Sequence, residues 1–330
     1  MDRLTTMRIF CRVVDSGSFA AAAREANLSP AAVTRLVADL EDHLGARLLT
    51  RTTRRLALTE IGEAYLERAR QILADVEEAE ALASHASSEP RGHLRVLVPP
   101  SFAVHQLAKH LPRFRAQYPQ VTVELHSPGP VETIDESFDI SLITVAQRPL
   151  DGSFVARRLA RCEVIACASP EYLNRRGRPQ HPRDLEQHEA MMPSSLREVT
   201  FMPGPFGADD APGEPVRLQV ARPALGTTHT DTMYAAALHG LGIAGLPSFV
   251  AEDALLENAL ERVLPEWHLF AMTIHAAMPT RKHVPARTRV FIDFLVATYG
   301  GEDRDPWLIA AQCPTQPLRR TPPPRELQNV

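Results

Sequence analysis

Apolar residues recur at helical spacing over residues 3–15 and again over 28–44. Between these segments, SFAAAAREA predicts a further short helix, which Ser18 can cap. Asn27 suits a left-handed turn residue, and Ser29 is the expected N-cap of the third helix. Two short helices joined by a tight turn are typical of a helix-turn-helix.

The third predicted helix, within LSPAAVTRLVADLEDHL, has an apolar face and a bare front. Its apolar face consists of Val33, Leu36, Val37, Leu40 and Leu44. Small residues begin the front, with Ala31 and Ala32 followed by Thr34 and Arg35. The small front and the apolar face lie on opposite sides, so the helix can pack and still present its front.

After Gly45, the segment RLLTRTTRRLALT predicts two short strands around a turn near 52–54. A long helix follows, and its apolar stripe comprises Ile61, Tyr65, Ala69, Ile72, Val76, Ala79 and Ala83. The stripe is too long for the small preceding domain to cover. We therefore expect pairing with the same helix of a second chain, and burial against the C-terminal part of this chain is the alternative.

Beyond the linker SSEPRG at 87–92, predicted strands and helices alternate up to residue 300. This alternation predicts an α/β fold with a parallel, helix-covered sheet in two subdomains. Subdomain I covers about 93–161 and 271–300, and subdomain II about 162–270. The tail, 301–330, is expected to be disordered. The alternative is a tail that packs through Trp307, Leu308 and Ile309.

Charge is separated along the first part of the chain, although the formal net charge of the whole chain is only -4. Residues 44–58 contain four arginines and no acid, whereas 60–89 contain eight acids and two arginines. A local basic patch is enough for DNA binding. An arginine-tipped hairpin directly after a helix-turn-helix is typical of a wing; solvated arginines on a hairpin packed against another domain are the alternative.

Several classes of protein are disfavoured. There is neither an apolar run long enough to span a bilayer nor a secretory leader, so the expected location is cytoplasmic. GxSxG, GxxxxGK[ST], HExxH and CxxC are all absent. Ser101 and His105 share a helix face, but no third catalytic group is identifiable. We therefore expect no enzyme activity, no metal site and no cofactor. Cys162 and Cys167 are expected to be buried thiols on opposite faces of a strand.

The run SFAAAAREANLSPAAVTRLVADLEDHLGARLLTRTTRRLALTEIG closely resembles the winged helix-turn-helix of LysR-type transcriptional regulators. The resemblance covers residues 1–300, and the wing is most similar to the CrgA-like branch of the family. It implies a winged helix-turn-helix at 1–58, a dimerisation helix at 59–88 and an effector-binding domain of type 2 periplasmic-binding-protein fold at 89–300. It also implies a homodimer or homotetramer that binds double-stranded promoter DNA and a small-molecule effector.

The predicted DNA-binding residues lie on the third helix and the wing. They are Ser29, Pro30, Ala31, Ala32, Thr34, Arg35, Arg51, Thr52, Thr53 and Arg54. A small-residue front lets a helix sit deep in the major groove, where alanine methyls contact thymine methyls and arginine reaches guanine. The wing arginines are expected to contact phosphates or enter the minor groove.

The predicted effector-binding residues lie where strands end, because ligands of two-lobed α/β domains bind there. They are Ser101, Phe102, Ser127, Thr144, Met202, Thr228 and Pro247. Through the family resemblance, the expected effector is a small organic anion. An effector-independent oligomeric repressor is the alternative function.

Overall fold

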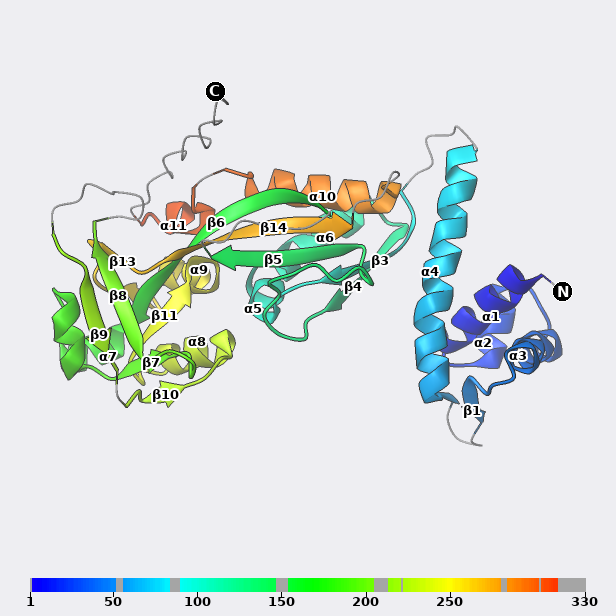
Figure 1. Cartoon of the computed structure of the whole chain (residues 1–330), viewed down its shortest axis with the longest axis horizontal. Helices are drawn as coiled ribbons and strands as arrows, with labels where there is room; N and C mark the ends of the chain where they lie inside the picture. Colours follow the sequence, from blue (N-terminus) through cyan, green and yellow to red (C-terminus); the bar gives the residue numbers. More distant parts are fainter. Residues whose placement is uncertain are drawn as a thin grey trace, which may run out of the picture. The chain divides into compact units, whose positions relative to one another are not determined.

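The structure is a computed structural model that describes residues 2–51, 56–83, 90–146, 154–204, 213–220, 222–279, 284–302 and 304–313 (Figure 1). The chain divides into two compact units, residues 1–89 and residues 90–330. The wing residues Thr52, Thr53 and Arg54 lie outside the described part of the chain, as does the side chain of Arg51.

The first unit contains three short helices, a two-stranded hairpin and one long helix. In chain order these are α1 (Arg3–Asp15), α2 (Phe19–Glu25), α3 (Pro30–Leu44), β1 (Leu49–Arg51), β2 (Leu56–Leu58) and α4 (Glu60–Ala83). The two strands are antiparallel, with Leu49 opposite Leu58. Figure 1 shows α1, α2 and α3 gathered on one side of α4. The predicted helix-turn-helix, hairpin and long helix are all present.

Local signals end the helices where the sequence predicts. Ser29 Oγ accepts a hydrogen bond from the Ala32 amide at 3.2 Å and so caps α3. Gly45 ends α3 with a left-handed φ of 64°, which a residue with a Cβ rarely adopts. Asn27 takes a left-handed φ of 53° in the turn between α2 and α3.

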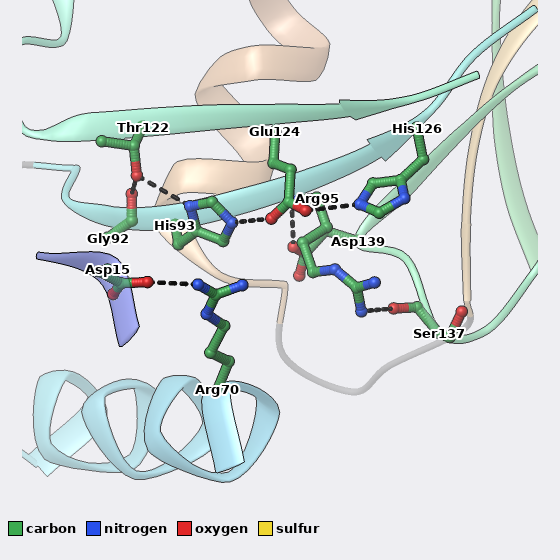
Figure 2. Close-up of polar contacts among 10 residues, drawn as sticks. All are labelled: Asp15, Arg70, Gly92, His93, Arg95, Thr122, Glu124, His126, Ser137 and Asp139. Carbon is green, nitrogen blue, oxygen red and sulfur yellow. Dashed lines mark hydrogen bonds and ion pairs between the residues drawn. The ribbon is translucent and has the colours of Figure 1, made fainter. Parts of the chain in front are cut away.

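The core of the first unit is formed by the inward faces of its helices and by the start of the hairpin. Its most buried members include Phe10, Val13, Ala22, Ala23, Val33, Val37, Leu48 and Ala69. The buried alanines of α2 allow α3 to approach closely. An ion pair between Asp15 on α1 and Arg70 on α4 adds a polar contact to this packing (Figure 2).

The second unit is built on one large mixed sheet. Its strands are β3 (Gly92–Leu97), β4 (Val121–His126), β5 (Ile140–Ala146), β6 (Phe154–Ala168), β7 (Ala190–Met192), β10 (Leu225–Gly226), β11 (Ile243–Pro247), β12 (Glu261–Arg262) and β14 (Ala271–Pro279). The order is β10-β7-β11-β6-β14-β5-β3-β4, with β12 also paired to β6. A small separate sheet has the order β13-β8-β9 and comprises β8 (Glu198–Pro203), β9 (Val216–Gln219) and β13 (Trp267–His268).

The prediction of a parallel sheet is only partly correct. The β3–β4, β3–β5, β7–β10 and β7–β11 pairs are parallel, but β6 and β14 run antiparallel to their neighbours. In the strand order, these two long strands are neighbours and lie between β11 and β5. β6 pairs with β14 up to Glu163 and with β11 from Val164, next to the predicted subdomain boundary. We call the half of the sheet that contains β3, β4 and β5 the first lobe, and the half that contains β7, β10 and β11 the second lobe.

Helices cover both lobes. They are α5 (Pro100–Phe102), which continues through the π-helical turn η1 (Ala103–Leu107) into α6 (Ala108–Gln117), then α7 (Pro170–Arg176), the 3₁₀ helix η2 (Pro182–Gln187), α8 (Thr230–Leu238), α9 (Ser248–Leu256) and α10 (Ala286–Tyr299). On the adjacent strands β3 and β4, Glu124 accepts hydrogen bonds from both His93 Nε2 at 2.5 Å and His126 Nε2 at 2.7 Å (Figure 2).

The prediction that the tail from 301 onward is disordered is wrong for residues 305–313. A final helix, α11 (Pro306–Ala310), docks on the second unit. Trp307 is buried against Phe102 and Phe249, and Leu308 is fully buried. The packed alternative therefore holds for these two residues, whereas Ile309 remains 48% exposed. Aromatic burial outweighs the proline-rich composition here, and residues 314–330 lie outside the described part of the chain.

Cys162 and Cys167 are both buried, in different core clusters, as their spacing on one strand predicts. Among the described helices, none combines the length and the apolar character that a bilayer crossing requires. The described residues also contain no group of three His, Cys, Asp or Glu side chains placed to hold a metal ion.

Candidate functional sites

The first candidate site is the front of α3. Val33, Val37 and Leu40 are buried in the core, so the helix is held from one side only. Ser29, Pro30, Ala31 and Arg35 are exposed, and Ala32 and Thr34 are half-buried. The predicted residues of this helix therefore share one accessible surface, in which small side chains precede a hydroxyl and a guanidinium.

The polar groups on this front differ in their freedom. Thr34 Oγ1 donates a hydrogen bond to the Pro30 carbonyl at 2.9 Å, so its methyl group and an oxygen lone pair remain for a partner. The Arg35 side chain is 82% exposed and is 3.9 Å from Asp39 Oδ2 in a loose ion pair. Such exposed pairs contribute little, about 0–1 kcal/mol, so the guanidinium is free to reach another partner.

Two residues that the sequence analysis missed attach the hairpin to its surroundings. Glu41 is buried on α3, and its Oε1 accepts hydrogen bonds from the Leu48 and Leu49 amides at 2.7 and 3.0 Å. Thr59 Oγ1 donates to the Arg47 carbonyl at 2.7 Å and accepts from the Gly62 amide at 2.9 Å, which caps α4. A carboxylate on an apolar helix face was the available signal for Glu41.

The long helix α4 carries two apolar faces rather than the single predicted stripe. Leu66, Ala69 and Leu73 are buried in the first unit, and thus the small domain covers more of the helix than expected. Ile61 and Ile72 are 59% and 42% exposed on another face of α4, about three turns apart. The second face has no cover within the described part of the first unit.

The second candidate site is a cleft between the two lobes of the second unit, with a volume of about 940 Å³. The first lobe contributes the start of α5, the loop at 128–134 and the end of β5. The second lobe contributes residues 228–230 at the start of α8 and Pro247 before α9, and Met272 of β14 completes the lining. Its size suits a small organic molecule.

Helices α5, α8 and α9 all begin at this cleft, and none has a side-chain cap. Their N-cap residues are Pro99, His229 and Pro247, which accept no hydrogen bond from the helix amides through their side chains. By contrast, α1, α2, α3, α7 and α11 are each capped by a side-chain oxygen, whereas α10, which begins away from the cleft, also lacks a side-chain cap. Uncapped first-turn amides and the positive end of the helix dipole both favour an anion.

The structure brings together four of the seven predicted effector residues. Ser101, Thr144, Thr228 and Pro247 all line the cleft. Thr133, His229, Thr230 and Met272 also line it and were missed. The segment Thr228-His229-Thr230 runs into α8, whose N-cap is His229 and whose first residue is Thr230, so helix-start reasoning could have found the last two of its residues.

Three predicted effector residues do not line the cleft. Phe102 is fully buried against Phe249, because the helical turn that exposes Ser101 points its neighbour into the core. Ser127 is exposed just before the lining loop. Met202 lies on β8, which belongs to the small separate sheet rather than to the main one.

His105 is 3.0 Å, through Nε2, from Asp231 Oδ1 and thereby joins the helix after Ser101 to α8. The hydrogen bond that the structure gives the His105 ring is therefore to Asp231 rather than to Ser101, which shares its helix face.

Two family models match the chain. The one described as bacterial regulatory helix-turn-helix protein, lysR family, matches residues 4–63. The one described as LysR substrate binding domain matches residues 87–300. An uncharacterized HTH-type transcriptional regulator of Haemophilus influenzae is 32% identical over 297 residues, which are 89% of this chain and 100% of the relative.

Solved structures of similar proteins cover nearly the same range. The structure of CrgA, a LysR-type transcriptional regulator from Neisseria meningitidis, matches 91% of this chain and 100% of that chain, with a TM-score of 0.53 and 32% identity. The full-length Vibrio cholerae virulence activator AphB matches 90% of this chain and 100% of its own, with a TM-score of 0.55 and 25% identity. Both matches include the cleft-bearing unit.

Proposed function

The chain belongs to the LysR family of bacterial transcriptional regulators, and we propose that it binds promoter DNA through α3 and the wing under the control of a small organic anion. One observation carries the proposal: the chain joins an accessible, small-residue helix front to a separate cleft at which three uncapped helices begin. Because it acts on bacterial promoters, its place of action is the cytoplasm.

The DNA-binding part of the proposal rests on the front of α3. The major groove admits one helix, and the exposed Pro30 and Ala31 let the backbone approach the base edges. Thr34 offers a methyl group to thymine, and Arg35 reaches guanine or a phosphate. Pro30 has no side-chain donor, so readout depends on Thr34, Arg35 and the wing.

Selection of binding sites from random DNA tests which residues read sequence. Arg35→Ala is expected to lower discrimination at specific base pairs by about 1–3 kcal/mol, and so to change the selected motif. Arg51→Ala, on the wing, is expected to weaken binding to all sequences and to reduce the salt slope by about 1. An unchanged motif for Arg35→Ala would rule out the assigned reading surface.

The effector part of the proposal rests on the cleft. Three uncapped helix starts converge there, and the hydroxyls of Ser101, Thr144 and Thr228 add donors that suit a carboxylate. Glu132 also lines the cleft and disfavours a second negative charge. We therefore propose a ligand with one carboxylate rather than several.

A panel of small monocarboxylates, each paired with its uncharged primary amide, tests this proposal by calorimetry. We expect at least one acid to bind, with its amide about tenfold weaker, since one charge-assisted contact is worth about 1.4 kcal/mol or more. DNA footprints with and without that acid are expected to differ. If no panel member bound and the footprints were constant, the effector-independent oligomeric repressor would be favoured.

We also propose that the exposed Ile61–Ile72 face of α4 pairs with the same face of a second copy. Exposed isoleucines at a three-turn spacing on a long helix suit an interhelical seam. Ile72→Arg is expected to shift the chain toward monomers in sedimentation velocity. Glu63→Arg, on another face of the helix, serves as the control and is expected to keep the wild-type distribution.

A further inference from the structure

A second cavity, of about 600 Å³ and partly open to solvent, lies in the second lobe. One wall is formed by β6, β7 and β11 of the main sheet, through residues such as Val164, Met191 and Ile243. The opposite wall is formed by Phe201 of β8 and Leu218 of β9, from the small sheet. Ile243, Phe201 and Leu218 also belong to one buried core cluster, so the two sheets pack together where these residues meet. The cavity is partly open to solvent, because Leu196 and Phe270 of its lining are 39% and 36% exposed.

This cavity is distinct from the effector cleft. Among the described residues, the two hollows share only Thr230, Pro247 and Met272, which stand between them. The cleft is lined by helix starts and hydroxyls, whereas the walls of the second cavity are mostly aliphatic, aromatic and methionine side chains. Methionines adapt readily to the shape of an apolar ligand.

His188 supplies a hydrogen-bond donor with a fixed orientation at this cavity. The buried Tyr172 hydroxyl accepts from the Glu189 amide at 2.8 Å and is 3.1 Å from His188 Nδ1. The hydroxyl hydrogen must point to Nδ1, because the other tautomer would leave a buried donor without an acceptor. The ring proton then lies on Nε2, for which the described residues provide no partner.

The surroundings of the His188 ring favour its uncharged form. Burial lowers its pKa from the ordinary value, and the nearby Arg176 guanidinium lowers the pKa further. The neutral ring therefore presents one N–H donor rather than a positive charge.

The charges around the cavity do not favour an anion. Glu186 and Glu189 line it together with a single cation among the described lining residues, Arg222. Glu189 is paired with Arg176, at 3.3 Å, so the positive and negative charges balance and no excess positive charge attracts an anion. An uncharged ligand avoids the cost of burying a charge between apolar walls.

We propose that this cavity is a second ligand site, which binds an uncharged aromatic molecule with one hydrogen-bond acceptor. The aromatic part lies between the two sheets, and the acceptor receives the Nε2 hydrogen of His188. The site stands independently of the anion proposed for the cleft.

Gly245 on β11 provides a way to fill the cavity. A Cβ added there would meet Val164 Cγ1 at 3.7 Å and Leu269 Cδ1 at 3.8 Å, both ordinary contacts with lining residues. A larger side chain at this position would extend into the cavity. Leu196 offers a second, safer way, because it lines the cavity and is 39% exposed.

The test is a fluorescence titration of the full chain with prodan, an uncharged naphthalene that carries a ketone and a dimethylamino group. Its emission shifts to the blue in apolar surroundings. For the wild type, we expect saturable binding with a blue shift of the emission. The affinity of Leu196→Trp and of Gly245→Leu for prodan is expected to be at least tenfold lower. Leu241→Trp is the matched control, because Leu241 is 40% exposed and does not line the cavity. Circular dichroism verifies that each variant is folded.

Thr228→Trp blocks the cleft instead, and prodan binding to this variant is expected to match the wild type. The proposal is overturned by an absent blue shift, or by unchanged binding in the folded Leu196→Trp variant. Loss of binding in Thr228→Trp alone would also overturn it, because prodan would then occupy the cleft. If Gly245→Leu fails to fold, Leu196→Trp against Leu241→Trp decides the outcome.

Discussion

At the scale of single residues, the buried carboxylate of Glu41 positions a proposed binding surface to which Glu41 itself does not belong. It is 5% exposed, and its strongest contacts are to two backbone amides of the hairpin rather than to a cation. Arg47 Nη1 is 3.9 Å from Glu41 Oε2, which is too far for a short charge-assisted hydrogen bond. The carboxylate thus fixes the hairpin relative to α3, and with it the two parts of the proposed DNA-binding surface.

Glu41→Ala is expected to reduce the free energy of unfolding by about 2–3 kcal/mol, because two buried amides lose a charged acceptor. Glu41→Gln keeps an acceptor oxygen and is expected to restore much of this loss. Urea denaturation measures both effects, and Asp42→Ala at an exposed neighbouring position is the control. Equal stability of Glu41→Ala and Asp42→Ala would contradict the role assigned to Glu41.

At the scale of elements, α11 lies beyond residue 300, where the family match ends, and yet it joins the cores of both lobes. Trp307 packs in the cluster that contains Phe102 and Phe249, whereas Leu308 packs in a cluster of the second lobe. Asp305 caps the helix and also accepts a hydrogen bond from Ser248 Oγ at 2.6 Å. The short helix therefore stabilises the region behind the cleft.

Trp307→Ala is expected to cost about 3–5 kcal/mol of unfolding free energy, as large buried aromatic residues do. Ile309→Ala, on the exposed side of the same helix, is expected to cost no more than about 0.5 kcal/mol. Denaturant unfolding of the two variants gives the comparison. Similar small losses for both would indicate that α11 does not contribute to the core.

At the scale of the whole second unit, β6 passes through both lobes and carries buried charges where its pairing changes from β14 to β11. Arg161 and Glu163 are 1% and 2% exposed, with Nη2 and Oε1 3.3 Å apart. Burial raises the pKa of Glu163 from its ordinary value of 4.5 to about 7, against the attraction of Arg161. A raised pKa means that the folded state holds the proton more tightly than the unfolded chain does.

This sets a direction for the pH dependence of stability. The contribution of Glu163 is fully present below about pH 4.5, where both states are protonated, and is lost as the pH rises through about 7. Glu163→Gln is expected to flatten the fall in thermal midpoint over this interval. Glu189→Gln, at a half-exposed position, is the control and is expected to retain the wild-type slope. Parallel curves for wild type and Glu163→Gln would contradict the assignment.

Predictions from the sequence were most accurate where the signal lies within a few consecutive residues. Ser29 caps α3 and Gly45 ends it, because capping and left-handed φ angles depend on local chemistry. The buried face of α3 follows its helical period in the same way. The winged helix-turn-helix and the two-lobed sheet were therefore predictable, and the family resemblance added their order.

Predictions failed where distant segments meet. Met202 was assigned to the cleft as a strand end, but β8 pairs in a separate sheet. The composition of the tail predicted disorder, but Trp307 packs against Phe249, which is more than 50 residues away in the chain. Glu41 was not singled out from the sequence, because its hydrogen bonds are to hairpin amides rather than to its neighbours on α3.

By itself, the sequence determined the elements, the accessible small-residue front of α3 and the strand ends that form part of the cleft, because periodicity, caps and turns are properties of neighbouring residues. Only the tertiary structure decided which helix starts share one cleft, which sheets enclose the second cavity and which buried acid holds the hairpin. Sheet order and side-chain packing bring together residues that are far apart in the chain, and local sequence patterns do not predict those contacts.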